Sequence, residues 1–278
     1  MQAPTSMTLP TAPGINFHRH EIPAWLQTRY IETGYRANLN FLQCFTSIFS
    51  VHNEVVAIWT HLLPALVFGG LTASFFFSNH RHSALFAQTS FSFTLVFTAS
   101  AFMHTFNPIN EEWHLWTLGL DWAAIAFVIY GVGHSLSSLV YYHDPRRQDM
   151  WKLAFAVPCS AFASIASWGG FHYLPQVTKI SLVLLPSLAI LAFGFDLCHR
   201  LPSHELQIVK DVMRVPLLLT ISGILVYGAQ FPERQFQDIN FDMTRGHHLY
   251  HHVWSSAFAF IYLRNTWKWA QKIGIKHY

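Results

Sequence analysis

Charged side chains are scarce in this chain of 278 residues, since Asp, Glu, Lys and Arg make up only 11% of it. A soluble globular domain carries roughly 25%, whereas hydrophobic residues reach 52% here. A helix needs about 20 apolar residues to cross the hydrocarbon core of a membrane. Seven stretches of the chain contain no charged residue at all: 55–78, 82–110, 122–143, 153–178, 180–195, 215–232 and 246–263. This pattern predicts an all-α integral membrane protein built as a bundle of seven transmembrane helices.

Signals of several other classes of protein are also missing. Met1–Pro13 has neither the basic start nor the apolar core of a cleavable signal peptide, so the first span is expected to direct membrane insertion. The three cysteines, Cys44, Cys159 and Cys198, show no pairing or ligand spacing and are expected to be small buried hydrophobes. The net charge of +3 is spread along the chain, which argues against a nucleic-acid partner. No phosphate-binding glycine loop, Gly-x-Ser-x-Gly elbow or His-Glu-x-x-His motif is found.

The N-terminal region lies outside the predicted spans. Residues 1–20 are polar and are expected to form a disordered tail, and residues 21–278 are expected to form one membrane domain. Apolar side chains recur at helical offsets within 38–51, at Phe41, Phe45, Ile48 and Phe49. This spacing predicts a short interfacial helix before the first span. Because its polar face is uncharged, packing beneath the bundle is an equally good interpretation.

The connections between the predicted spans hold most of the charges and several prolines. The longer ones are 107–117, 143–152, 199–214 and 231–245. With this segmentation the N-terminal region and the second, fourth and sixth loops carry six of the 17 Lys and Arg residues, and the rest of the chain carries eleven. The positive-inside rule then favours a cytoplasmic C-terminus.

Four polar residues lie where predicted spans meet their flanking loops: His104, Asp121, His247 and His251. The chain reverses direction at every crossing, so the end of the second span and the starts of the third and seventh share one face of the membrane. His247 and His251 are four residues apart and therefore lie on one helical stripe, where a single cation can contact both imidazoles. The sequence predicts a buried metal site at this face.

Zinc suits the residues that converge there. A catalytic-type zinc site takes three protein ligands and leaves a fourth position to water, and His104, His247 and His251 supply three imidazoles. Asp121 is placed to accept a hydrogen bond from such a water. Ser100 lies one helical turn before His104 and could belong to the same site, although a bond back to its own helix explains it equally well.

The residues alone leave the choice of histidines open. His248 and His252 form a second pair at the same spacing of four, so either pair could bind the ion. Asn53 and Glu54 open the first span at the same face, where Asn53 is expected to cap the helix. Glu54 and His61 are seven residues apart on one stripe and could extend a polar network into the bundle.

Several blocks together resemble the progestin and adiponectin receptor family. They are His52-Asn53-Glu54, Ile58-Trp59-Thr60-His61, Ser100-x-x-x-His104, Leu120-Asp121-Trp122, Phe231-Pro232-Glu233-Arg234 and Gly246-His247-x-x-x-His251. The resemblance runs from about residue 20 to the end, and the segments 110–114 and 246–251 are most similar to the membrane progestin receptor branch. The family is in turn similar to hemolysin III-type and alkaline ceramidase proteins. Trp122 and His248 depart from its usual pattern, and the bulky Trp122 bears on the shape of the cavity.

The resemblance implies a seven-helix receptor fold in the plasma membrane or an internal membrane. It implies Zn²⁺ held by His104, His247 and His251 rather than by the second pair, with Asp121 reaching the zinc-bound water. The expected partner is a steroid or another lipid-like molecule from the bilayer, and the oligomeric state and signalling partner stay open. Resemblance to adiponectin receptors implies a cytoplasmic N-terminus, opposite to the orientation that the charge count favours.

Two other functions fit the same residues. The similarity to alkaline ceramidases implies a zinc-dependent lipid amide hydrolase, in which Asp121 would serve as the catalytic general base. A purely structural zinc in a scaffolding or membrane-sensing protein is the third interpretation.

Overall fold

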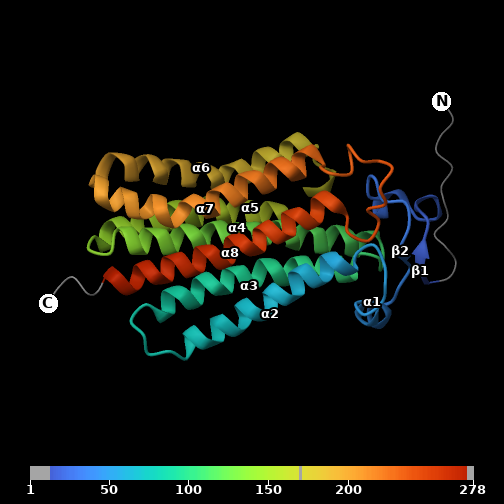
Figure 1. Cartoon of the computed structure of the whole chain (residues 1–278), viewed down its shortest axis with the longest axis horizontal. Helices are drawn as coiled ribbons and strands as arrows, with labels where there is room; N and C mark the ends of the chain where they lie inside the picture. Colours follow the sequence, from blue (N-terminus) through green and yellow to red (C-terminus); the bar gives the residue numbers. More distant parts are fainter. Residues whose placement is uncertain (1–12, 169–170, 274–278) are drawn as a thin grey trace.

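Seven long helices form the body of the protein in the computed structural model, which describes residues 13–168 and 171–273 (Figure 1). Each helix overlaps one of the seven uncharged stretches, so long helices occur where the sequence predicts them. They are α2 (Val55–Phe76), α3 (Ser83–Phe106), α4 (Glu111–Val140), α5 (Pro145–Ala166), α6 (Gln176–Arg200), α7 (Ser203–Ala229) and α8 (Gly246–Ile273). A short 3₁₀ turn, Phe171–Tyr173, precedes α6.

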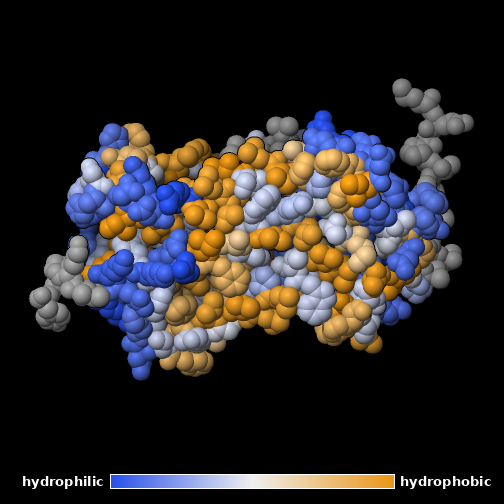
Figure 2. All heavy atoms as spheres, viewed as in Figure 1, coloured by the Kyte–Doolittle hydropathy of each residue, from blue (hydrophilic) through white to orange (hydrophobic). Residues whose placement is uncertain are grey.

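On the face that Figure 2 shows, the apolar residues of these helices form a band between two hydrophilic ends. Among the described residues α2, α3, α4 and α7 are both long enough and apolar enough to cross a membrane. The other three helices have 22, 25 and 28 residues, so they match a bilayer in length while carrying more charge.

Helices that follow one another along the chain pack side by side as antiparallel neighbours. Among the described residues, α7 packs mainly against α8 rather than against α6. The last helix, α8, also contacts α2, α3 and α4 (Figure 1). It therefore connects the first helices of the bundle to α7. The core at these contacts is largely aromatic and includes the fully buried Phe68, Phe86, Phe93, Phe155 and Tyr262.

Small residues let α4 approach its neighbours closely. A Cβ atom added at Gly133 would lie 2.5 Å from the ring of Phe155 in α5, and one added at Gly131 would overlap Ser92 in α3. Close backbone approach at glycine is a common device in membrane helices. Both glycines are therefore needed for the packing of α3, α4 and α5.

Gly133→Ala is expected to lower the free energy of unfolding by about 1–3 kcal/mol, the usual cost of overpacking a tight core. Gly70→Ala is the matched control, because a Cβ atom there meets nothing within 4 Å. Thermal unfolding of both variants in the same detergent provides the measurement. Equal melting temperatures for the two variants would show that α4 and α5 pack less tightly than described.

Two predicted connections, 143–152 and 199–214, are largely helical in the structure. Helix α5 begins at Pro145, where the Asp144 side chain accepts a hydrogen bond from the Arg147 backbone, and α7 begins at Ser203. Both helices start with charged turns, as helices do where they extend beyond the apolar band. Charge therefore indicates where the apolar band ends and not where the helix ends.

The segment before α2, residues 13–54, folds over one end of the bundle and is called the N-terminal cap below (Figure 1). Strand β1 (Gly14–Phe17) pairs antiparallel with β2 (Tyr35–Ala37), so a small sheet accompanies the helices. This strand lies within residues 1–20, which the sequence predicted to be disordered, while residues 1–12 lie outside the described part of the chain. Two 3₁₀ turns, Arg19–Glu21 and Ala24–Leu26, lie between the strands.

The short helix predicted before the first span is present as α1 (Phe41–Ser47). Phe41 and Phe45 are exposed, whereas Cys44 and Ser47 are buried against the protein. Asn40 caps the helix and accepts a hydrogen bond from the Gln43 backbone. Helix α1 thus has one apolar exposed face and one face packed on the bundle, as an interfacial helix requires.

Candidate metal centre

Three histidines meet at the end of the bundle that the N-terminal cap covers. His104 lies near the C-terminal end of α3, and His248 and His252 lie in the first two turns of α8. One potential ligand atom from each lies within 4.8 Å of the other two. The Nε2 atoms of His104 and His248 are 3.3 Å apart. These residues are called the histidine cluster below.

The geometry of the histidine cluster fits a divalent cation. Two nitrogens bound tetrahedrally to zinc at 2.0–2.1 Å are themselves about 3.3 Å apart, close to the separation of His104 and His248. Lone pairs of neutral imidazoles that face each other repel unless a proton or a cation lies between them. Three imidazoles with one position left open are also the donor set of many zinc sites.

Hydrogen bonds at the other ring nitrogens orient two of these histidines. His104 Nδ1 donates to Glu54 Oε2 at 2.8 Å, which leaves its Nε2 lone pair facing the cluster. His252 Nδ1 pairs with the hydroxyl of Thr60 at 3.0 Å. Metal-binding histidines usually have such a partner, which fixes the tautomer and the ring orientation.

Glu54 connects the cluster to the rest of this end of the bundle. Besides His104, its carboxylate accepts hydrogen bonds from Asn107 at 3.1 Å and from Arg245 at 2.5 Å. Burial alone would raise the pKa of Glu54. The opposing effect of Arg245, His104 and Arg36 is larger, so the pKa lies well below its usual value. Glu54 is therefore an ionised acceptor for all three donors.

A second buried arginine supports α3 from the N-terminal cap. Arg36 is only 2% exposed, and its guanidinium donates to the carbonyls of His104 at 2.6 Å and Thr105 at 3.1 Å. These carbonyls belong to the last turn of α3, where no helical donors remain. Burial lowers the pKa of Arg36 to about 10 although Glu54 raises it, so Arg36 stays protonated at neutral pH.

Another neutral histidine holds the start of α2. Burial and the neighbouring Arg36 lower the pKa of His52 to about 3. Its Nε2 donates to the Ser47 carbonyl at 3.0 Å, and its Nδ1 accepts from the Glu54 backbone at 3.1 Å. His52 thereby fixes the backbone from which the Glu54 side chain reaches the cluster.

A fourth histidine, His61, packs directly on the histidine cluster. Its ring centroid lies 3.8 Å from that of His252 and 5.7 Å from that of His104. In the part of the chain that the structure describes, its Nδ1 atom is buried and has no hydrogen-bond partner. The polar stripe that the sequence indicated, from Glu54 to His61, therefore does run into the bundle beside the candidate site.

The pair that the resemblance favoured lies elsewhere. The backbone and Nδ1 of His247 donate to Glu233 at 2.8 and 2.7 Å. The ring of His251 faces α7, where it lies 5.3 Å from the ring of Tyr227 and close to Gly223. Neighbouring residues on a helix point about 100° apart, so only one of the two pairs can face His104. The structure brings the second pair, His248 and His252, to it.

Asp121 reaches the same region from α4, as the parity of the spans predicted. Its carboxylate interacts with the Ser100 hydroxyl and lies near both His104 and Tyr227. Ser100 is buried and its hydroxyl bonds to Asp121. The Asp121 carboxylate therefore lies close to His104 of the cluster.

Sequence reasoning missed several residues of this region. Arg245 and Arg36 bring buried positive charge to Glu54, Thr60 orients His252, and Glu233 holds the start of α8. Glu233 and Thr60 stand in blocks that carry the resemblance, and Arg36 ends the upstream block Tyr30-Ile31-x-x-Gly34-Tyr35-Arg36, which also fits it. The resemblance was the available signal for these three residues. No local pattern indicates that an arginine at position 245 folds inward.

Comparison with known proteins identifies the fold family. The sequence profile described as haemolysin-III related matches residues 49–262. The chain belongs to the haemolysin-III related family. The matched region of this family member contains Glu54, Asp121, His61 and the three residues of the histidine cluster, whereas most of the N-terminal cap precedes it.

Relatives of this haemolysin-III family member include named membrane receptors. Membrane progestin receptor alpha of Mus musculus is 28% identical over 255 residues, which cover 86% of this chain and 73% of the receptor. Membrane progestin receptor beta of Homo sapiens is 26% identical over 254 residues, covering 83% and 70%. An adiponectin receptor protein of Drosophila melanogaster is 27% identical over 287 residues, covering 88% and 57%. The family match and the apolar helices together establish an integral membrane protein.

Proposed function

We propose that this haemolysin-III relative is a seven-pass membrane receptor for a steroid or another lipid-like ligand, with a zinc ion held inside the bundle. The convergence of three imidazoles from α3 and α8 carries the zinc part of this proposal. All seven long helices would cross the membrane, with the charged turns of α5, α6 and α8 at its surfaces. The histidine cluster would then lie inside the bundle near one membrane face, beneath the N-terminal cap.

Zinc would join α3 to α8 through His104 and one pair of histidines on α8. The geometry supports His248 and His252, whereas the resemblance supports His247 and His251. A bound zinc ion supplies a fixed link between helices and a Lewis acid with one free position. The chain itself supplies Glu54, which orients His104, and Asp121, which lies beside the site.

The ligand class follows from the relatives and from the environment. Two of the relatives are named as progestin receptors, and a site between apolar helices is reached most directly from the bilayer. Ligand binding would then change how the helices pack around the zinc link.

Equilibrium binding of labelled progesterone to folded, zinc-loaded protein in nanodiscs tests this proposal. We expect saturable binding that unlabelled steroid displaces, together with about one zinc per chain. Neutral lipids of other classes are tested in the same assay as competitors. The receptor proposal fails if no steroid or neutral lipid binds saturably.

Asp121 supports a second candidate function. A carboxylate next to a zinc site can act as a general base in hydrolysis, so a lipid amide such as ceramide is the candidate substrate. The test compares fatty-acid release from a fluorescent ceramide by wild type, His104→Ala and Asp121→Asn. Equal release by all three proteins would exclude hydrolysis as the function. If the zinc is purely structural, a chelator that removes it should lower the melting temperature and leave ligand binding unchanged.

A further inference from the structure

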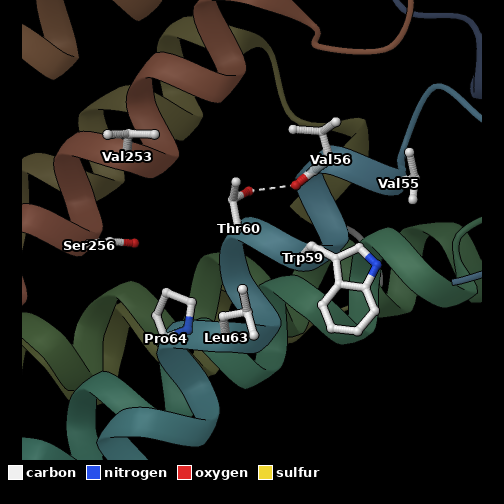
Figure 3. Close-up of a pocket in the computed structure, with 8 residues that line it drawn as sticks. All are labelled: Val55, Val56, Trp59, Thr60, Leu63, Pro64, Val253 and Ser256. Atoms are coloured by element: carbon white, nitrogen blue, oxygen red, sulfur yellow. Dashed lines mark hydrogen bonds between the residues drawn. The ribbon is translucent and has the colours of Figure 1, made fainter. Parts of the chain in front are cut away.

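An apolar groove runs between α2 and α8 beside the histidine cluster (Figure 3). Its volume of about 470 Å³ lies within the range of small-molecule sites. Its lining extends along α2 from Val55 to Pro64, roughly 14 Å at the rise of an α-helix. The apolar walls are formed by Val55, Val56, Trp59, Leu63, Pro64 and Val253.

One polar group in the groove lacks a partner. The Ser256 hydroxyl is buried and has no hydrogen-bond partner among the described residues, and Figure 3 shows it pointing from α8 toward α2. Hydrocarbon cannot satisfy a hydrogen-bond donor, so lipid tails alone leave this hydroxyl unpaired.

The groove is preformed and is joined to the histidine cluster. Trp59 is held in place because its Nε1 donates to the Ile48 carbonyl at 2.9 Å. Thr60 lines the groove and its hydroxyl also contacts His252 Nδ1 at 3.0 Å. A molecule that contacts Thr60 is therefore one residue away from a candidate zinc ligand.

We propose that this groove binds a neutral lipid that carries one polar oxygen, a hydroxyl or a carbonyl, on an apolar body. The oxygen accepts a hydrogen bond from Ser256, while the apolar body fills the space beside Trp59. A charged headgroup is excluded because the lining residues include no charged side chain. This assignment rests on the proposed receptor function and locates its ligand.

A pair of photoreactive sterols tests the assignment on the full chain in phosphatidylcholine nanodiscs. One probe carries a diazirine and a hydroxyl group, and the other has hydrogen in place of the hydroxyl. After irradiation, mass spectrometry identifies the labelled residues. We expect the hydroxyl probe to label residues 55–64 and 253–256 and to be displaced by excess unlabelled sterol. Its labelling yield should be about five- to tenfold higher than that of the second probe, which is the difference in affinity that one hydrogen bond predicts.

Two variants separate the hydroxyl contact from the shape of the groove. Ser256→Ala should reduce labelling by the hydroxyl probe to the level of the second probe. Its control is Ser255→Ala, because the Ser255 hydroxyl bonds to its own helix at the His251 carbonyl. Leu63→Trp should fill the groove and abolish labelling, and Leu66→Trp is the control at an exposed α2 position that does not line the groove.

The assignment is overturned if both probes label the protein equally, or if labelling spreads over the lipid-facing helices. Since the comparison of the two probes uses wild type, it decides the question even where a variant fails to fold. Zinc content and progesterone binding are measured on the same samples. Saturable binding that persists without labelling of the groove rejects this assignment alone, whereas the absence of any saturable lipid binding rejects the receptor function.

Discussion

Replacing His252 with alanine should strip zinc from the purified protein, whereas replacing His251 should leave it bound. His252 belongs to the group of three imidazoles around His104, and His251 faces Tyr227 on α7. Two remaining imidazoles provide too few ligands for a stable zinc site. Plasma mass spectrometry of dialysed protein should therefore find about one zinc per chain in wild type and His251→Ala, and almost none in His252→Ala.

His104→Ala is the reference variant, because it removes a ligand whichever pair of α8 histidines binds the ion. Gel filtration and circular dichroism establish that each variant is folded before its zinc content is compared. Zinc lost from His251→Ala and retained in His252→Ala would establish the pair that the family resemblance favours. Zinc retained by His104→Ala would remove the metal site from this region altogether.

Glu54→Gln is expected to produce the largest loss of stability. Glu54 is 8% exposed and faces the partly buried guanidinium of Arg245, with the buried Arg36 close by. Removing one partner of a buried ion pair leaves an uncompensated charge and costs about 3–5 kcal/mol. The same change removes the carboxylate that orients His104, so zinc affinity should fall about 10- to 100-fold. Thermal unfolding and competition with a zinc-binding dye provide the two measurements.

Glu112→Gln is the matched control, because it removes the same charge from an exposed position in the first turn of α4. A second variant, Glu54→Gln with Arg245→Gln, removes both partners and should recover part of the stability. Zinc affinity should stay low in the double variant, since His104 still lacks its carboxylate. Unchanged stability in Glu54→Gln would mean that Arg245 does not depend on this ion pair.

The long helices could be predicted because a membrane imposes a simple rule on composition. Uncharged stretches such as 55–78 and 82–110 coincide closely with α2 and α3. The rule fails at α7, which starts at Ser203 although the uncharged stretch starts at 215. Charges exclude a segment from hydrocarbon but do not end a helix in water. The strand Gly14–Phe17 was missed for a related reason, since it pairs outside the apolar band.

The number of membrane crossings predicts at which end of the bundle the candidate site lies, but not which residues face one another there. Counting crossings placed His104, Asp121 and the α8 histidines at one end of the bundle, and the structure places them there. Which α8 pair faces His104 depends on the rotation of that helix, and one residue changes the direction by about 100°. The packing of α8 on α7 and α2 sets this rotation. No spacing within the sequence contains that information.

The ion pair of Glu54 with Arg245 also constrains the order in which the chain can mature during synthesis. The two residues are 191 positions apart, so Glu54 and Arg36 leave the ribosome long before the helix that completes their surroundings. Until then, the Glu54 carboxylate and the Arg36 guanidinium lack these surroundings and must stay hydrated or be bound by a chaperone near the edge of the bilayer. Truncations that end before Arg245 should therefore be degraded rather than accumulate as folded protein.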